Sequence, residues 1–114
     1  MSNAHHSRID ALKTRASVFA ALGDETRLSV LTKLCNARPQ SISRLTAGTN
    51  LSRQAVTKHL GVLANAGVVR SLRVGRENLF ELEPQRIEEI RNYLDQISKQ
   101  WDAALARLKS HVEE

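Results

Sequence analysis

The chain has 114 residues, of which 41% are apolar and only 4% aromatic. This length is typical of a single domain. One cysteine excludes an internal disulfide, and no apolar run reaches the roughly 20 residues that span a membrane. With no secretory signal pattern at the start, we expect a cytoplasmic protein without a membrane partner.

Seventeen Lys and Arg against twelve Asp and Glu give a net charge of +5, and this charge is unevenly distributed. Residues 41–80 contain six basic side chains and one acidic side chain, whereas residues 81–114 contain five basic and eight acidic ones. The middle of the chain therefore suits a polyanionic partner such as nucleic acid, while the C-terminal part is expected to have another role.

Apolar residues spaced by three and four predict a first helix from Ile9 through Leu12, Ala16 and Phe19 to about Gly23. Residues 1–8 are expected to be disordered, and residues 2–4 (Ser-Asn-Ala) have the appearance of a cloning remnant. We therefore predict a single domain over residues 9–112.

A second helix is expected to begin after Asp24, whose carboxylate can accept hydrogen bonds from free backbone amides. Pro39 prevents its continuation. The apolar positions expected to face the core are Leu28, Leu31, Leu34 and Cys35.

A short third helix and a longer fourth helix follow, capped by Ser41 and Ser52. Residues 48–50 (Gly-Thr-Asn) favour a sharp corner between them. Gly67 is placed to end the fourth helix. Two helices joined by a tight turn predict a helix-turn-helix. The buried stripes are expected to be Ile42 and Leu45 in the third helix and Val56, Leu60 and Leu63 in the fourth.

Residues 68–74 and 79–82 are rich in β-branched and apolar side chains, and residues 75–78 (Gly-Arg-Glu-Asn) contain turn formers. They predict a β-hairpin. A long last helix is expected from Pro84, so the fold is mainly α with a small β-hairpin, a winged helix-turn-helix. The apolar stripe of this last helix is Ile87, Ile90, Leu94, Ile97, Trp101, Leu105, Leu108 and Val112.

The face of the fourth helix opposite its apolar stripe lacks acidic residues. A helix of this kind can enter the DNA major groove, where Arg53 suits guanine and Gln54 suits adenine. Thr57 can contact a thymine methyl group or a phosphate, and Lys58 suits phosphate. A solvated surface is the alternative for an isolated helix, but the corner before it and the basic hairpin after it favour DNA.

The hairpin is expected to lay Arg73 and Arg76 along the DNA backbone or into a minor groove. Arg70 has two open roles, an ion pair or a DNA contact. His59 is expected to hydrogen-bond to the backbone, and Arg27 to pair with Asp24 or Glu25. The predicted DNA-binding set is Ser52, Arg53, Gln54, Thr57, Lys58, Arg73 and Arg76.

Residues 19–28 (FAALGDETRL) and 51–60 (LSRQAVTKHL) resemble the opening and recognition-helix signatures of the ArsR family of bacterial winged-helix repressors. Residues 66–69 (AGVV) and 75–76 (GR) extend this resemblance through the hairpin. The resemblance implies a two-fold homodimer formed by the first and last helices, although the last stripe could instead pack within its own chain. The predicted dimer interface comprises Ile9, Leu12, Phe19, Ile90, Leu94, Ile97, Trp101, Leu105 and Leu108.

Many relatives sense metals through cysteine pairs in the third helix or Asp and His in the last helix. This chain has neither set, because its third helix lacks cysteine and His111 has no histidine partner at helical spacing. No metal or cofactor is therefore expected. Cys35 is expected to pack as a small hydrophobic residue rather than act as a redox sensor, and an effector remains unidentified.

No nucleophile, base and orienting group form a recognisable pattern, so an enzyme is not expected. The sequence predicts a sequence-specific double-stranded DNA-binding regulator that represses by covering promoter DNA as a homodimer. The alternative is a winged-helix module that binds another protein, because a fold alone does not fix function.

Overall fold

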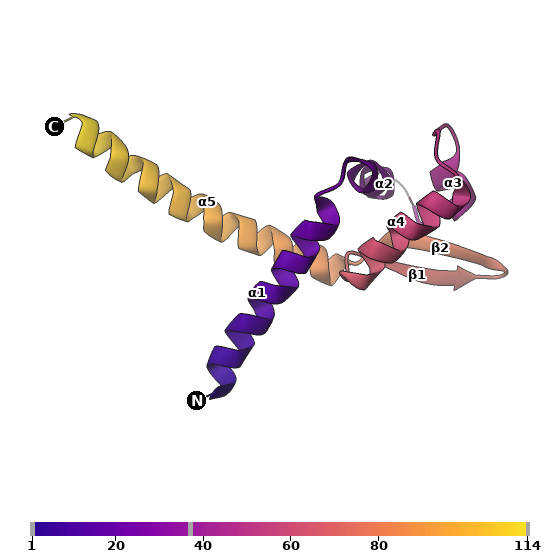
Figure 1. Cartoon of the computed structure of the whole chain (residues 1–114), viewed down its shortest axis with the longest axis horizontal. Coiled ribbons are helices and arrows are strands. Elements are labelled where there is room, and N and C mark those ends of the chain that lie inside the picture. Colours follow the sequence, from indigo (N-terminus) through magenta and orange to yellow (C-terminus); the bar gives the residue numbers. More distant parts are fainter. Residues whose placement is uncertain (1, 37, 114) are drawn as a thin grey trace. The chain divides into compact units, whose positions relative to one another are not determined.

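A computed structural model describes the backbone of residues 2–36 and 38–113 and the side chains of residues 8–36 and 38–113. The order of elements confirms the predicted fold, mainly helical with one antiparallel hairpin (Figure 1). The elements of this described part are α1 (Ser2–Leu22), α2 (Glu25–Cys35), α3 (Ile42–Thr46), α4 (Arg53–Asn65), β1 (Val69–Val74), β2 (Glu77–Leu82) and α5 (Pro84–Glu113).

The chain divides into two compact units, residues 1–83 and residues 84–114. The first unit contains α1 to β2, and the second consists of α5. A single domain over residues 9–112 stays a prediction. Helix α1 starts at Ser2, seven residues before the expected start at Ile9. The segment before Ile9 contains no Pro or Gly, and each residue added to a helix end gains a backbone hydrogen bond.

Three predicted N-caps are confirmed. The Asp24 carboxylate accepts a hydrogen bond from the Arg27 amide at 2.9 Å, and the Ser41 hydroxyl accepts one from the Arg44 amide at 3.2 Å. The Ser52 hydroxyl accepts the Ala55 amide at 3.1 Å. Each bond satisfies an amide that has no partner within its own helix, and together these bonds fix where α2, α3 and α4 begin.

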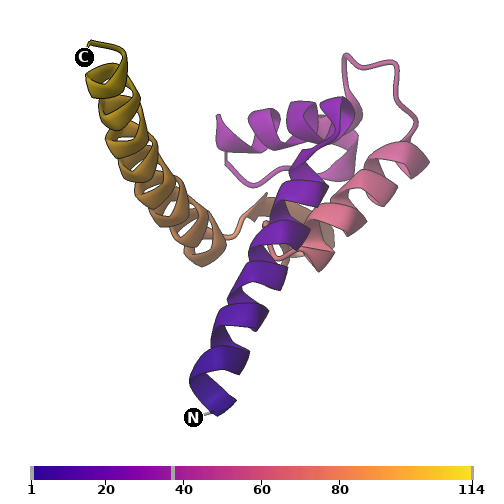
Figure 2. The same ribbon diagram turned by 60° about the vertical axis from the view of Figure 1, so that its left-hand side comes forward.

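The core of the first unit lies between α4 and the elements around it. Val56, Leu60 and Leu63 of α4 are at most 1% exposed, as predicted, and Leu45 of α3 is fully buried. Helix α1 packs against both α2 and α4 (Figure 2). The other core residues are Val18, Ala21, Val30, Leu34, Ala66, Val68 and Val69.

The inner face of α2 differs from the predicted one. Val30 and Leu34 are buried, whereas Leu28 is 46% exposed and Cys35 is exposed. The interpretation of Cys35 as a packed hydrophobic residue is therefore wrong. Arg27 lies three residues before Val30 and therefore belongs to the inner face of α2. A search for apolar residues at helical spacing does not detect a polar residue on that face.

The side chain of Arg27 caps the end of α1. Its Nε donates to the Ala21 carbonyl at 2.6 Å and a terminal nitrogen donates to the Ala20 carbonyl at 3.4 Å. The predicted ion pair with Asp24 or Glu25 is absent from the described residues. The last carbonyls of a helix lack internal partners and carry partial negative charge, so a guanidinium is a suitable donor for them.

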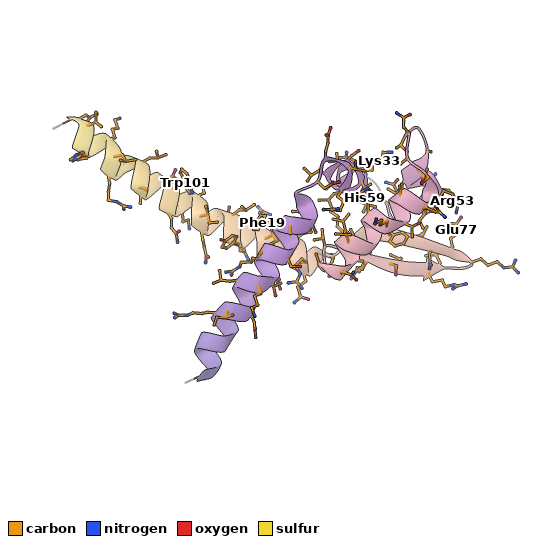
Figure 3. All side chains as sticks on the ribbon, viewed as in Figure 1. Phe19, Lys33, Arg53, His59, Glu77 and Trp101 are labelled. Carbon is orange, nitrogen blue, oxygen red and sulfur yellow. The ribbon has the colours of Figure 1, made fainter. Side chains whose placement is uncertain are left out.

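Lys33 performs a similar task for α3. Its Nζ donates to the carbonyls of Leu45 at 3.1 Å and Ala47 at 3.4 Å. Figure 3 shows the Lys33 side chain on α2. Lys33 thus ties α2 to the end of α3 and to the start of the turn that leads into α4.

Helix α4 ends in a Schellman motif that aims the chain into β1. The Val68 amide donates to the Leu63 carbonyl at 3.0 Å, and the Gly67 amide donates to the Ala64 carbonyl at 2.9 Å. Gly67 has φ of +77°, a conformation that favours glycine, as predicted for this position.

The hairpin turn is shorter than predicted. Strand pairing begins at Val74 and Glu77, so only Gly75 and Arg76 form the turn. Gly75 has φ of +63°, and no described non-glycine residue has a positive φ, which matches a two-residue type II′ turn. Glu77 and Asn78, which we placed in the turn, therefore belong to β2.

A short bridge ties the hairpin to the chain before α3. Gln40 and Phe80 exchange two backbone hydrogen bonds of 2.9 and 2.8 Å. The side chain of Gln40 also donates to the Lys33 carbonyl at 2.8 Å. These bonds tie β2 to the segment that connects α2 and α3.

Helix α5 spans 30 residues and has no buried residue. Its start at Pro84 is as predicted. On the predicted stripe, Trp101 is 64% exposed and Leu108 is 61% exposed, while Ile90 and Ile97 are half-buried. Helix α1 likewise exposes Leu12 and Phe19.

The cap at Asp24 predicts a pH-dependent stability. The hydrogen bond from the Arg27 amide lowers the pKa of Asp24 below its usual value of 3.8. Its contribution to stability is therefore present above pH 3.8 and is lost as the pH falls through the lowered pKa. Thermal unfolding should show a smaller loss of Tm below about pH 4 in Asp24→Asn than in the original chain.

Asp24→Ala should lower the Tm at neutral pH, because it removes the cap, whereas Asn retains a capping oxygen. Equal Tm values for the Ala variant and the original chain would show that this cap does not stabilise the fold.

Candidate nucleic-acid interface

One face of α4 forms an exposed, acid-free ridge. Arg53, Gln54, Thr57 and Lys58 are all exposed, and we call these four residues the recognition ridge. They lie opposite the buried stripe of the same helix, so their accessibility confirms the predicted orientation of α4. The described part of the chain leaves this ridge uncovered.

The hydroxyl of Thr57 donates to the Arg53 carbonyl at 2.7 Å. This bond uses the hydroxyl hydrogen within the helix and fixes the side-chain rotamer. Ser52 is also exposed, but its oxygen accepts the capping bond from Ala55. Ser52 therefore has a structural role at the start of the ridge.

A hollow of about 300 Å³ joins the start of α4 to the hairpin turn. Arg53 contributes one wall and Arg76, the second turn residue, contributes another. Figure 3 shows Arg53 beside Glu77 of β2. We call this space the tip hollow, and its lining residues are Ser41, Ile42, Ser43, Arg53, Arg76, Glu77 and Asn78.

Sequence reasoning missed the tip-hollow residues other than the two arginines. Ser43 is exposed in the first turn of α3, one residue before the amide that Ser41 caps. Asn78 pairs with Arg73 across the hairpin, so the two side chains share one face of it. A two-residue turn at residues 75 and 76 places Asn78 opposite Arg73. Knowing the length of the turn would therefore have identified Asn78 from the sequence.

The two arginines of β1 lie on opposite faces of the hairpin. Arg73 is exposed, whereas Arg70 pairs with Glu81 at 2.8 Å and with Glu83 at 3.5 Å. The hydrogen bond to Glu81 is the main cause of a raised pKa at Arg70. Because side chains alternate between the two faces of a strand, Arg70 and Arg73 point to opposite sides. Of the two roles left open for Arg70, the structure supports the ion pair.

His59 is half-buried and does not belong to the recognition ridge. Figure 3 shows it between α4 and α2, and its Nδ1 is buried without a hydrogen-bond partner. We predicted that His59 hydrogen-bonds to the backbone, and its Nδ1 makes no such bond. The location of His59 between two packed helices excludes it from the outer face of α4.

The described residues contain no group of three or more His, Cys, Asp and Glu side chains placed to hold a metal ion. Within the same residues, no helix is both long enough and apolar enough to cross a membrane. Cys35 is the only cysteine in the chain, and it is exposed at the end of α2.

Residues 24–71 match the family model described as bacterial regulatory protein, arsR family. This match covers α2 to the first residues of β1, which includes the complete recognition ridge. The predicted family resemblance is thus supported by the segment that carries the ridge.

Two relatives extend the similarity beyond this segment. The ArsR-like transcriptional regulator from Rhodococcus sp. RHA1 is 41% identical, with coverage of 87% of this chain and 92% of that chain and a TM-score of 0.74. The HTH-type transcriptional regulator Rv2034 of Mycobacterium tuberculosis is 32% identical over 87 residues, which are 76% of this chain and 78% of the relative.

A third comparison concerns the fold alone. The homodimeric winged helix-turn-helix DNA-binding domain of Mb0332 from Mycobacterium bovis is 17% identical, with a TM-score of 0.67 and coverage of 82% of this chain and 85% of that domain. The fold is therefore a winged helix-turn-helix, in which α3 and α4 form the helix-turn-helix and the hairpin is the wing. The two relatives above are transcriptional regulators. On this evidence the chain belongs to the ArsR family of bacterial transcriptional regulators.

Proposed function

We propose that the protein binds specific double-stranded DNA as a homodimer and represses transcription by covering promoter DNA. The observation that carries this proposal is the exposed recognition ridge, which continues through the tip hollow to Arg76. In this arrangement the N-terminal half of α4 enters the major groove, where a helix fits. The wing turn then meets the neighbouring backbone or minor groove.

The residues of the recognition ridge and the wing fall into two groups. Readers can hydrogen-bond to bases, and anchors can bind the phosphate backbone. Arg53 can donate two hydrogen bonds to guanine, and Gln54 can pair with adenine. Lys58 and Arg76 suit phosphate, which holds the protein in place on any sequence. Arg73 lies on the hairpin face that is free of the Glu81 ion pair, and we assign it to the DNA backbone as well.

The homodimer is supported by apolar side chains that a single chain leaves exposed. Trp101, Leu105 and Leu108 recur along α5 at spacings of three and four and are each more than half exposed. A water-exposed stripe of this kind is typical of a helix that packs on a second helix. Helix α1 adds Leu12 and Phe19 to this set. The homodimeric Mb0332 domain is a precedent for such an assembly in this fold.

Genome-wide selection of fragments bound by the purified full-length protein tests the proposal directly. We expect enriched sites with two-fold symmetry and half-sites about 10 base pairs apart, or a multiple of this, as for other symmetric helix-turn-helix dimers. Recovery of a stoichiometric protein partner, with no enriched fragments at low salt, would instead support the protein-binding module.

The division into readers and anchors predicts different losses of binding for substitutions of Arg53 and Lys58. Arg53→Ala should remove about 1–3 kcal/mol of discrimination at one base pair of the selected site. Lys58→Ala should weaken binding to all sequences similarly and should reduce the slope of log affinity against log salt by about one. Titrations of the selected site, single-base variants and random DNA distinguish the two effects. Equal discrimination in Arg53→Ala and the original chain contradicts the reading role.

Glu77 is the one carboxylate in the lining of the tip hollow, next to Arg53 and Arg76. Its negative charge opposes DNA phosphates, so Glu77→Gln should raise affinity for specific and random DNA alike, by about threefold to tenfold at low salt. Asp10→Asn removes the same charge from the exposed surface of α1 and is the matched control. An equal gain in both variants would show that only net charge matters.

If the last helix forms the dimer interface, a charged side chain in place of Trp101 should weaken the dimer strongly. Trp101→Glu should raise the dimer dissociation constant by at least about 30-fold, because a tryptophan anchor typically contributes 2 kcal/mol or more. Sedimentation velocity over a concentration series measures this constant. Gln100→Glu introduces the same charge at the adjacent exposed residue, off the stripe, and should leave the dimer intact. A monomeric original chain at micromolar concentration contradicts the homodimer.

A further inference from the structure

A second and larger cavity lies beside the wing and shares Ser41 and Glu77 with the lining of the tip hollow. It encloses about 640 Å³, within the range of small-molecule sites in proteins. None of its lining residues belongs to α4. We call it the wing cavity, and its lining residues are Arg38, Pro39, Ser41, Arg44, Leu72, Val74, Glu77 and Leu79.

One wall of the wing cavity is apolar. Leu72 pairs with Leu79 across the hairpin, and Val74 lies two residues beyond Leu72, so all three side chains share one face. Val74 is 55% exposed, and both leucines are half-buried. Pro39 also lines the cavity. These aliphatic groups offer a surface to the apolar body of a ligand, because covering them removes hydrocarbon from water.

The cavity also contains two arginines that are not neutralised. Arg38 and Arg44 are exposed, and neither forms an ion pair among the described residues. By contrast, Arg70 on the same hairpin face is held by two carboxylates. Glu77 is the one acidic lining residue, so the lining has a net charge of +1. A single negative charge on a ligand balances this lining, and a guanidinium binds a carboxylate through paired hydrogen bonds.

We propose that the wing cavity binds a small organic monoanion, a carboxylate attached to an aromatic or aliphatic body. Arg38 and Arg44 hold the carboxylate, and Leu72, Val74 and Leu79 cover the apolar body. The proposal assigns an effector-type site to the wing and stands independently of DNA binding, since it is tested with protein and ligand alone.

The probe is para-trifluoromethylbenzoate, titrated with the full-length protein and followed by fluorine NMR. We expect saturable binding with a Kd below about 1 mM. The isosteric neutral amide para-trifluoromethylbenzamide lacks the charge, and trifluoroacetate lacks the apolar body. Each should bind at least about tenfold more weakly, because each loses one of the two groups of contacts.

Substitutions of lining residues test whether the ligand binds in the wing cavity. Arg44→Gln and Arg38→Gln should each weaken benzoate binding by about tenfold, and Val74→Glu should abolish it. Arg8→Gln, an exposed arginine of α1 outside the cavity, is the matched control and should bind normally. Circular dichroism and Tm confirm that each variant is folded. The proposal is overturned if Arg44→Gln and Arg8→Gln bind equally, if the amide binds as well as the acid, or if neither this acid nor octanoate saturates the protein by about 10 mM.

Discussion

The burial of one stripe of α4 is the constraint on which the rest of the structure depends. Val56, Leu60 and Leu63 fill the centre of the first unit and are almost completely removed from water. Because a helix advances about 100° per residue, fixing this stripe also fixes the opposite face. The recognition ridge is therefore outward by necessity. A rotation of α4 that buried Arg53 would expose the same leucines, at a cost of about 1.5–3 kcal/mol for each.

The wing depends on the same core. Val68 and Val69 are buried next to the end of α4, and the backbone bridge from Gln40 to Phe80 holds the other strand. With both strands held in this way, Arg76 of the hairpin turn lines the same hollow as Arg53 at the start of α4. The two cavities beside the wing share Ser41 and Glu77 in their walls. A ligand in the wing cavity would thus lie directly beside the surface that we assign to DNA.

Several polar residues in this fold serve helix ends rather than ion pairs. Arg27 donates to carbonyls at the end of α1, and Lys33 donates to carbonyls at the end of α3. For Arg27 we predicted an ion pair with Asp24 or Glu25, whereas its acceptors are backbone carbonyls of α1. Such acceptors are invisible in a pattern of side chains, and this also explains why the inner face of α2 was misjudged.

The sequence by itself determined the order of the elements, the three N-caps, the buried stripe of α4 and its basic outer face, because each follows from local hydrogen bonding and helical periodicity. Only the tertiary structure decided the ion pair of Arg70, the burial of the His59 Nδ1 and the exposure of Cys35. It also brought Arg53 to Arg76 and created the wing cavity. These features depend on which elements pack together, and long-range packing is not encoded in the spacing of any single segment.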